Sequence, residues 1–377
     1  MAEQQRGSCS WETYLRLNSF EEPVFTHPID YADDAHGRIL GELVLEDVSE
    51  NIAPGATAWR TGQIALQSGQ SLDVVLTHSP ATAGFMYLHR MPMQTHLFDL
   101  LDLPMPESAP ADMALPGQVI LGAPRTKQVG SAISDAMSSP QIREAIASCT
   151  QDEVVILPVL REGAKFQVAE ALFDIAGYYC DEAILDSHHV FDPTVPRYHR
   201  RVETTILKDQ DISPRQREGK RLAIVGDSIA SGIVMLGVLG HVGRRFDHIG
   251  QIEIVAPFAT LRGLARLALY SPPRFRIRVH VFETLLNALP PDYYYSAHYP
   301  EAGFHIRPDL EEQYREWWGT DADGNYIADT ACAGYGWAEA FFNPRKQLQM
   351  IDDQLSERHG LTIAEVVQRN ITLNLQF

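Results

Sequence analysis

The chain has 377 residues, of which 45% are hydrophobic, and a formal net charge of −18. This length exceeds one average domain and can bury a large core without disulfide or metal cross-links. The acidic charge argues against a nucleic-acid partner, because proteins that bind phosphate backbones usually carry a basic surface. It leaves room for a small anionic ligand, which needs only a local pocket of positive potential.

The four cysteines are far apart and show no spacing typical of a zinc site: Cys9, Cys149, Cys180 and Cys332. We therefore expect free thiols in a reducing compartment. The first residues, MAEQQRGSCSWETYL, lack the apolar core of a secretion signal, and no stretch has the length and apolar character of a membrane span. The sequence thus predicts a cytoplasmic protein with no membrane partner.

Residues 1–115 predict a small β-rich region. RILGELVLEDV and SLDVVLTHS are apolar or alternating runs of strand length, and turn residues such as APGAT separate them. The segment 105–118 is rich in proline and typical of a linker, since proline removes helical hydrogen bonds and stiffens extended chain. We place the first domain boundary near residue 115.

Residues 116–342 predict an α/β domain, because strand-length apolar runs alternate with segments of helical spacing. Four runs predict strands: EVVILPVL, RLAIVG, IGQIEIVAPF and RFRIRVHVFE. Helical segments follow the first three, which predicts a doubly wound, mostly parallel sheet with helices on both faces. Residues 343–377 predict a helical C-terminal appendage.

The first of two notable strand-to-helix turns follows the strand in VVILPVLREGAKF. Ligands of open parallel sheets bind at the carboxyl ends of the strands. Gly163 lets the backbone approach a ligand closely, and the planar guanidinium of Arg161 suits phosphate oxygens. This turn is therefore a candidate phosphate site.

The second turn lies in LAIVGDSIASGIVMLGVL, where an apolar strand ends at Asp227 and a Ser/Ala/Gly turn leads into a helix. The first N–H groups of a helix have no partner within it, so they form an anion site. Asp227 is placed to accept hydrogen bonds from sugar hydroxyls beside a phosphate. The alternative is an ordinary turn in which Asp227 and Ser231 cap the helix.

Together the two turns resemble those of uracil phosphoribosyltransferases. VILPVLREGAKF is similar to the family's pyrophosphate-side loop, and AIVGDSIASGIVML is similar to its phosphoribosyl-pyrophosphate (PRPP) loop. ETLLNALPPDYYY and GNYIADTACAGYGWAEAFF are similar to the stretches around the family's base-binding segment. The resemblance covers residues 120–342 and implies an α/β fold of phosphoribosyltransferase type.

The resemblance implies a transfer of the 5-phosphoribosyl group of PRPP to a heterocyclic nitrogen, with release of pyrophosphate. It makes Asp227 and Arg161 catalytic, and it implies Mg²⁺ that is bound through the phosphates, without direct protein ligands. The implied PRPP-binding residues are Arg161, Glu162, Gly163, Asp227, Ser228, Ile229, Ala230, Ser231, Gly232, Ile233 and Val234. The implied base-binding residues are Tyr326, Ile327, Ala333, Gly334 and Tyr335. Candidates for the flexible arm that reaches PRPP are His188, His189, Arg200 and Arg201.

Two departures from the family pattern concern specificity. Ile233 and Val234 replace a glycine and a hydroxyl residue of the phosphate loop, and the base segment lacks the family's acidic and arginine positions. We therefore expect a pyrimidine-like or other flat heterocyclic acceptor in a specialised biosynthetic or salvage pathway. A homodimer is the expected assembly.

Two other interpretations remain open. In one, the protein keeps this fold as a regulator that senses PRPP or a nucleotide, and the altered phosphate loop reflects lost catalysis. In the other, it is a different α/β enzyme with a coincidental match. The retained Arg161-Glu162-Gly163 turn favours catalysis, because a nucleotide sensor has no need of a pyrophosphate loop.

Overall fold

The computed structural model describes these parts of the chain: residues 45–47, 56–66, 69–86, 88–92, 112–116, 123–160, 163–191, 200–208, 212–229, 232–259, 261–283, 285 and four isolated positions between 356 and 365. The predicted base-binding segment lies outside the described residues. The predicted C-terminal appendage contains only the four isolated positions, so its helices stay a prediction.

A single ten-stranded sheet forms the centre of the molecule. Its strands are β1 (Leu45–Asp47), β2 (Ala58–Ala65), β3 (Ser71–His78), β6 (Val154–Leu160), β7 (Asp181–Glu182), β8 (Ile184–Phe191), β9 (Arg200–Lys208), β10 (Leu222–Gly226), β11 (Gln251–Ala256) and β12 (Arg276–Phe282). Their order across the sheet is β1-β2-β3-β12-β11-β10-β6-β8-β9, and β7 also pairs with β6. Neighbours from β3 to β8 are parallel, whereas the pairs β1–β2, β2–β3 and β8–β9 are antiparallel.

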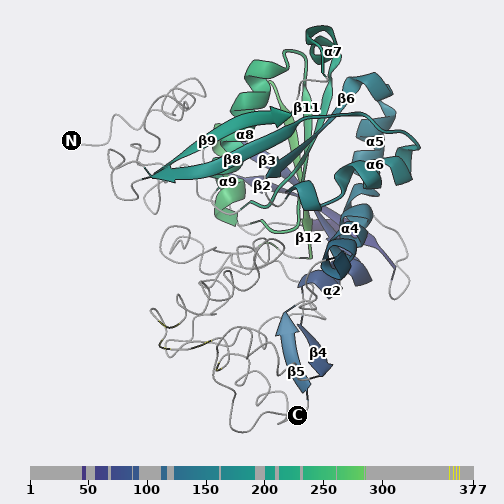
Figure 1. Cartoon of the computed structure of the whole chain (residues 1–377), viewed down its shortest axis with the longest axis vertical. Helices are drawn as coiled ribbons and strands as arrows, with labels where there is room; N and C mark the ends of the chain where they lie inside the picture. The colour runs from purple at the N-terminus through teal and green to yellow at the C-terminus, as the bar shows by residue number, and fades with distance from the viewer. Residues whose placement is uncertain are drawn as a thin grey trace, which may run out of the picture.

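Helices cover both faces of this sheet, which confirms the predicted doubly wound, mostly parallel α/β fold. One side carries α4 (Ala123–Met137), α5 (Pro140–Ala147) and α6 (Val168–Ala176), and the other carries α8 (Ile233–Arg245) and α9 (Leu261–Tyr270) (Figure 1). Two short helices lie at the ends of strands: α2 (Pro80–Met86) follows β3, and α7 (Pro214–Gly219) precedes β10. Ser139 caps the amino end of α5 by accepting a hydrogen bond from the Ile142 N–H.

The central strands are buried on both faces, as their continuous apolar sequences predict. Every residue of β10 is buried, and so are the first six residues of β6. Side chains alternate between two core layers: Ile254 of β11 packs with residues of α8 and α9, whereas Val255 packs with residues of α4 and α6. The central strands are therefore packed on both faces up to the end of β10.

The N-terminal strands are continuous with the α/β sheet. β3 pairs in parallel with β12, with Phe282 opposite Thr77, and β2 and β1 extend the sheet beyond β3. The predicted β-rich region thus contributes strands to the same sheet, and the boundary near residue 115 stays a prediction. A separate antiparallel pair, β4 (Leu88–Pro92) and β5 (Asp112–Pro116), places a strand inside the segment expected to be a linker. Proline is tolerated there because Pro116 ends a strand that has one partner.

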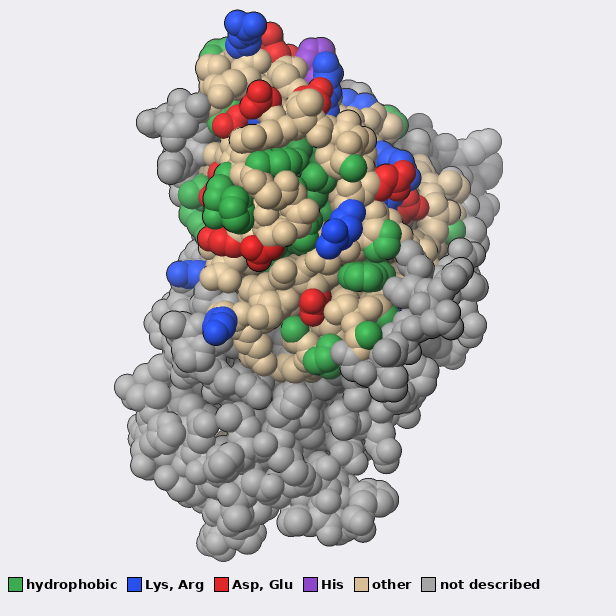
Figure 2. All heavy atoms as spheres, turned by 90° about the vertical axis from the view of Figure 1, so that its right-hand side faces the viewer, with side chains coloured by type: hydrophobic (Ala, Val, Ile, Leu, Met, Phe, Trp, Pro, Cys, Tyr) green, Lys and Arg blue, Asp and Glu red, His purple; other side chains and the backbone are tan. Residues whose placement is uncertain are grey.

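The surface over α4 to α6 is mixed in character. On this face lysine and arginine side chains are scattered among acidic and hydrophobic ones and are not gathered in one patch (Figure 2). Phe173 and Tyr179 are exposed, and their rings stack with centroids 4.5 Å apart.

Among the described residues, Cys149 and Cys180 are free, and no helix is long and apolar enough to span a membrane.

A buried lysine joins the amino ends of the central strands. Lys220, directly before β10, is fully buried, and its Nζ lies 2.6 Å from Asp181 Oδ2 in β7. The same ammonium donates to the carbonyl of Asp152, in the turn before β6, at 2.8 Å and to that of Val154, the first residue of β6, at 2.9 Å. Beside it, burial raises the pKa of Cys180 to about 12, so this thiol stays neutral at physiological pH. The network holds the edge of the sheet opposite the candidate site.

Replacing this lysine is expected to destabilise the protein without touching the candidate site. Lys220→Met leaves Asp181 and two carbonyl oxygens without their buried donor, which costs about 3 kcal/mol of unfolding free energy. Urea denaturation measures the loss. The control is Lys127→Met on the exposed side of α4, where a change below about 0.5 kcal/mol is expected. Equal effects of the two substitutions would contradict the proposed role of Lys220.

Candidate functional site

The strand order contains one point at which the direction of the chain reverses. From β6 the chain moves outward to β8 and β9, then returns to the other side of β6 with β10 and continues to β11 and β12. In open α/β sheets, ligands bind outside the carboxyl ends of the two strands at such a point. Here these strands are β6 and β10, and the turns that follow them are the two turns singled out in the sequence.

Two glycines bring these turns into direct contact. In the parallel pairing, Gly226 at the end of β10 lies opposite Pro158 of β6. A Cβ at Gly163 would overlap the carbonyl oxygen of Gly226, and a Cβ at Gly226 would lie 3.2 Å from Val168 Cγ2. Gly163 is therefore required for the contact between the turns. Arg161 and Glu162 lie outside the described residues, so their predicted roles stay predictions.

Asp227 is the first residue beyond β10 and is buried, with 9% of its surface exposed. Its Oδ1 accepts a hydrogen bond from the Ser228 N–H at 2.9 Å, and its own N–H donates to the Val255 carbonyl at 3.3 Å. The carboxylate thus orders its own turn, as aspartate does in local side chain–backbone motifs. Asp227 is not a helix cap, because the N-cap of α8 is Gly232.

Ile229 shapes the turn from within the core. Its surface is 1% exposed, its N–H donates to the Phe258 carbonyl at 2.8 Å, and it forms a parallel bridge with Ala259. The segments that follow β10 and β11 are therefore joined to each other. Since the Ile229 N–H is already bonded within the protein, this predicted PRPP-binding residue fixes the turn and offers a ligand no free donor.

Gly232 sets the amino end of α8. Its φ of +78° lies in the left-handed region, no side chain caps the helix there, and a Cβ would lie 2.7 Å from the Gly263 carbonyl oxygen in α9. The first N–H groups of α8, including those of Ile233 and Val234, thus stand at the carboxyl edge of the sheet without a side-chain acceptor from the N-cap. Val234 packs against the core, which explains a hydrophobic residue in place of a hydroxyl. Ala230 and Ser231 lie outside the described residues.

The candidate arm residues are brought together by the β8–β9 hairpin. β8 pairs with β6 only as far as Leu160, which lies opposite Asp186, so the hairpin continues past the carboxyl end of β6. The four candidates occupy that extension, with His188 opposite Glu203, His189 opposite Val202, Arg201 opposite Val190 and Arg200 opposite Phe191. Their backbone positions are thus on the side of the sheet where the two turns lie, and their role stays a prediction.

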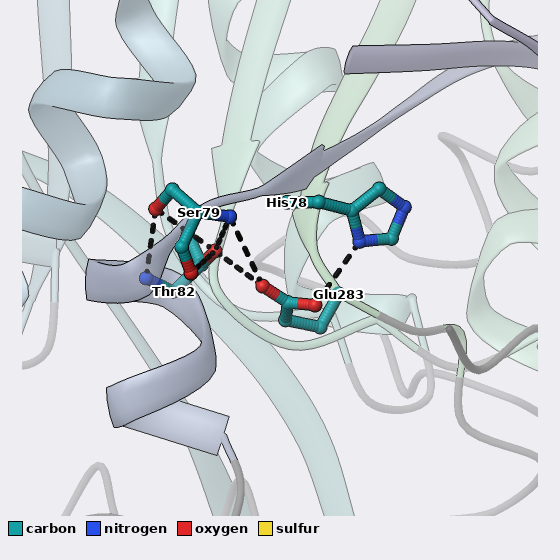
Figure 3. A network of polar contacts seen from close by, with 4 residues as sticks. All are labelled: His78, Ser79, Thr82 and Glu283. Atoms are coloured by element: carbon teal, nitrogen blue, oxygen red, sulfur yellow. Dashed lines mark hydrogen bonds and ion pairs between the residues drawn. The ribbon is translucent and has the colours of Figure 1, made fainter. Parts of the chain in front are cut away.

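A second polar cluster at the carboxyl edge escaped the sequence analysis. His78, the last residue of β3, directs its Nδ1 at Glu283 Oε2, 3.0 Å away, and Glu283 directly follows β12 (Figure 3). The other carboxylate oxygen accepts from the Ser79 N–H at 3.2 Å and from Thr82 Oγ1 at 2.6 Å. The available signal was the one that identified Asp227, a polar residue immediately after a buried strand.

A third polar network lies within the sheet, under α5. Glu253 of β11 accepts from Arg278 Nη1 at 3.1 Å and lies 2.7 Å from His280 Nε2, both on β12. His280 Nδ1 lies 3.4 Å from Ser139 Oγ, so both ring nitrogens have partners. The network is buried and internally satisfied, which marks it as structural.

Within the described residues, no group of three or more His, Cys, Asp or Glu side chains has the arrangement of a metal site. Magnesium coordination through substrate phosphates therefore stays a prediction. Asp227 directly follows β10, one of the two strands at the point where the chain direction reverses, and its carboxylate lies at the candidate site.

The sequence matches no known family profile and no curated protein. Solved structures similar to this chain include a hypoxanthine phosphoribosyltransferase from Staphylococcus aureus, at 11% identity and a TM-score of 0.26, covering 48% of this chain and 90% of that one. Another is a Neisseria gonorrhoeae hypothetical protein with bound ppGpp, at 12% identity and a TM-score of 0.30, covering 50% and 90%. A third is a mutant hypoxanthine phosphoribosyltransferase from Trypanosoma cruzi complexed with the product IMP, at 14% identity and a TM-score of 0.28, covering 50% and 90%. These TM-scores are low, and the strand order and the two turns define the candidate site independently of these structures.

The glycine contact makes a direct prediction. Gly163→Ala pushes the first turn away from β10, because the new methyl group overlaps the Gly226 carbonyl. We expect a loss of about 1–3 kcal/mol in unfolding free energy, measured by urea denaturation, as for other overpacked sites. Gly250→Ala is the matched control, since a Cβ there meets nothing within 4 Å. A Gly163 variant as stable as the control would contradict the contact.

Proposed function

We propose that this protein is a phosphoribosyltransferase that moves the 5-phosphoribosyl group of PRPP to a flat heterocyclic base and releases pyrophosphate. The observation that carries the proposal is the contact between the two turns at the switch point of the sheet, through Gly163 and Gly226. PRPP carries phosphates at both ends of its sugar. Two adjoining turns, one leading into a helix amino end and one rich in phosphate-binding residue types, suit such a ligand.

Each part of PRPP has a proposed partner. The amino end of α8, with Ser228 and residues 230–234 around it, takes the 5′-phosphate through backbone N–H groups, while Ile229 only holds the turn in place. The carboxylate of Asp227 accepts hydrogen bonds from the ribose hydroxyls. Arg161, Glu162 and Gly163 bind the pyrophosphate. Mg²⁺ held by the substrate phosphates would neutralise their charge.

The proposed chemistry asks for positioning and charge stabilisation. The bond from C1′ to pyrophosphate breaks while the base nitrogen attacks, and positive charge develops on the sugar ring. The carboxylate of Asp227 beside the ribose stabilises that charge, and fixed donors around pyrophosphate stabilise the leaving group. Rigid placement favours both, and Asp227 is rigid because its turn is bonded to the segment after β11.

The acceptor is proposed only as a class. The resemblance to uracil phosphoribosyltransferases favours a pyrimidine-like base, with Tyr326, Ile327, Ala333, Gly334 and Tyr335 reading its edge. Two of the similar structures are hypoxanthine phosphoribosyltransferases, and their TM-scores do not decide between a purine and a pyrimidine. We propose a cytoplasmic homodimer that acts on small molecules and binds neither nucleic acid nor membrane.

The alternative is a regulator that senses PRPP or a nucleotide. Val234 packs into the core at a position where the resembled family offers a hydroxyl to the phosphate, and this favours weaker phosphate binding. A regulator and an enzyme share the same anion site, so a binding measurement does not distinguish them. A measurement of turnover distinguishes them, because only the enzyme releases pyrophosphate.

The experiment incubates the protein with PRPP, Mg²⁺ and single bases from a panel of pyrimidines and purines, and measures pyrophosphate release. Release with at least one base supports the enzyme. PRPP that raises the melting temperature without turnover supports the regulator, and PRPP that neither binds nor reacts overturns both.

Asp227→Asn tests the proposed centre. The substitution keeps the shape of the side chain and the acceptor oxygen for Ser228, but it removes the negative charge beside the developing cation. We expect turnover to fall roughly 100-fold or more with the melting temperature nearly unchanged. Asp174→Asn, at an exposed position of α6, is the control and should retain full activity. Undiminished activity of the Asp227 variant would refute its assigned role.

A further inference from the structure

One ring nitrogen of His78 lacks a partner although it is buried. His78 is 5% exposed, and within the described part of the chain its Nε2 is buried with no hydrogen-bond partner. Leaving a buried polar atom unsatisfied costs about 1–3 kcal/mol, so such an atom in a folded protein calls for an explanation. His280 is the contrast within the same sheet, since both of its ring nitrogens are bonded.

The other ring nitrogen determines what Nε2 offers. Glu283 is fully buried, and one of its oxygens accepts hydrogen bonds from the Ser79 N–H and the Thr82 hydroxyl. With Glu283 as acceptor for the imidazole as well, Nδ1 of His78 carries the proton that it donates to Glu283. Nε2 then has a free lone pair. It is an acceptor for a ligand N–H and, with the carboxylate behind the ring, a competent base.

The backbone at Glu283 is held in an unfavourable conformation to make this arrangement. Its φ is +56°, in the left-handed region that residues other than glycine rarely adopt. The Glu283 N–H bonds the Thr77 carbonyl at 3.0 Å, which fixes the residue against the end of β3. Strain of this kind costs about 1–3 kcal/mol and is concentrated at functional sites. The left-handed backbone of Glu283 and the unpaired Nε2 of His78 are independent observations. Both indicate a functional role for this pair of residues.

His78 lies on the same edge of the sheet as the two turns. The strand register aligns Gly226 of β10 with Val255 of β11, His280 of β12 and Val75 of β3. His78 therefore lies three residues further toward the carboxyl end of the sheet than Gly226. Three strand spacings separate β10 from β3, a lateral distance of about 14 Å. This is comparable to the length of an extended nucleoside monophosphate. A nucleotide with its 5′-phosphate at α8 and its base directed along this edge would therefore reach the ends of β12 and β3.

We propose that His78, oriented by Glu283, accepts the ring N–H of the heterocyclic acceptor and takes its proton during the transfer. The inference rests on the proposed function and names the group that activates the acceptor. The ring nitrogen forms the bond to C1′ with its electron pair, and the C1′–O bond breaks toward pyrophosphate. The proton passes from the ring nitrogen to His78 Nε2, and the carboxylate of Glu283 stabilises the imidazolium that forms.

The binding part of the proposal is tested without turnover. Protein with ¹⁵N-labelled histidine rings is titrated with single heterocycles from a panel that includes uracil and hypoxanthine, each with Mg²⁺ and pyrophosphate, so that no transfer occurs. The His78 Nε2 resonance is assigned by its loss in His78→Gln. We expect it to shift with the heterocycle that binds. The counterpart methylated on the reacting nitrogen should leave it in place, because it has no N–H to donate.

The catalytic part is tested by the same variant. His78→Gln keeps a polar group near the position of Nε2 but cannot take a proton. We expect kcat to fall roughly 100-fold, with KM for the acceptor changed only a few-fold. His280→Gln is the comparison, because that ring has only structural partners: it should lower the unfolding free energy, and its effect on kcat should be small.

The outcomes separate this proposal from the proposed function. A base that is turned over while the Nε2 resonance stays in place overturns the role of His78 and leaves the transfer standing. A shift of Nε2 without any turnover supports the N–H site and goes against the transfer. If His78→Gln loses only stability, like His280→Gln, the pair is structural and the proposal is wrong.

Discussion

The candidate site depends on a contact between two stretches of backbone. Gly163 after β6 approaches the carbonyl of Gly226 at the end of β10 so closely that a Cβ at Gly163 would overlap it, and Val168 at the start of α6 limits the room at Gly226. The contact lies where the strand order reverses, which is where the fold leaves space for a ligand above the sheet. The two turns that resemble phosphate loops can act on one ligand only because this contact holds them together.

The segment after β11 extends this arrangement across the sheet. The Ile229 N–H donates to the Phe258 carbonyl, Ile229 forms a bridge with Ala259, and Gly232 lies against Gly263 near the beginning of α9, so the second turn is fixed on two sides. The amino end of α8 is thereby placed at the edge with little freedom to move. A site that binds an anion through backbone N–H groups needs such rigidity, because the groups must already point at the ligand.

Buried charge is used differently in different parts of the sheet. At the amino edge Lys220 satisfies three oxygens, and under α5 Glu253 joins two cationic or polar partners, so both networks are closed. At the carboxyl edge the network of Glu283 is open, because it ends at His78 Nε2. Closed networks stabilise the sheet, whereas an open one at the edge that carries the candidate site is available for the proposed chemistry.

The sequence by itself determined the α/β class, the central strands and the position of Asp227 at a strand end, because these follow from local apolar patterns and turn residues. It also singled out the two turns, since their residue types suit phosphate. Only the tertiary structure decided that the turns touch, that Gly232 and not Asp227 caps α8, and that β1 to β3 join the same sheet. The pairing of His78 with Glu283 was decided there as well, because it joins residues 205 positions apart through the parallel pairing of β3 with β12, which no local pattern encodes.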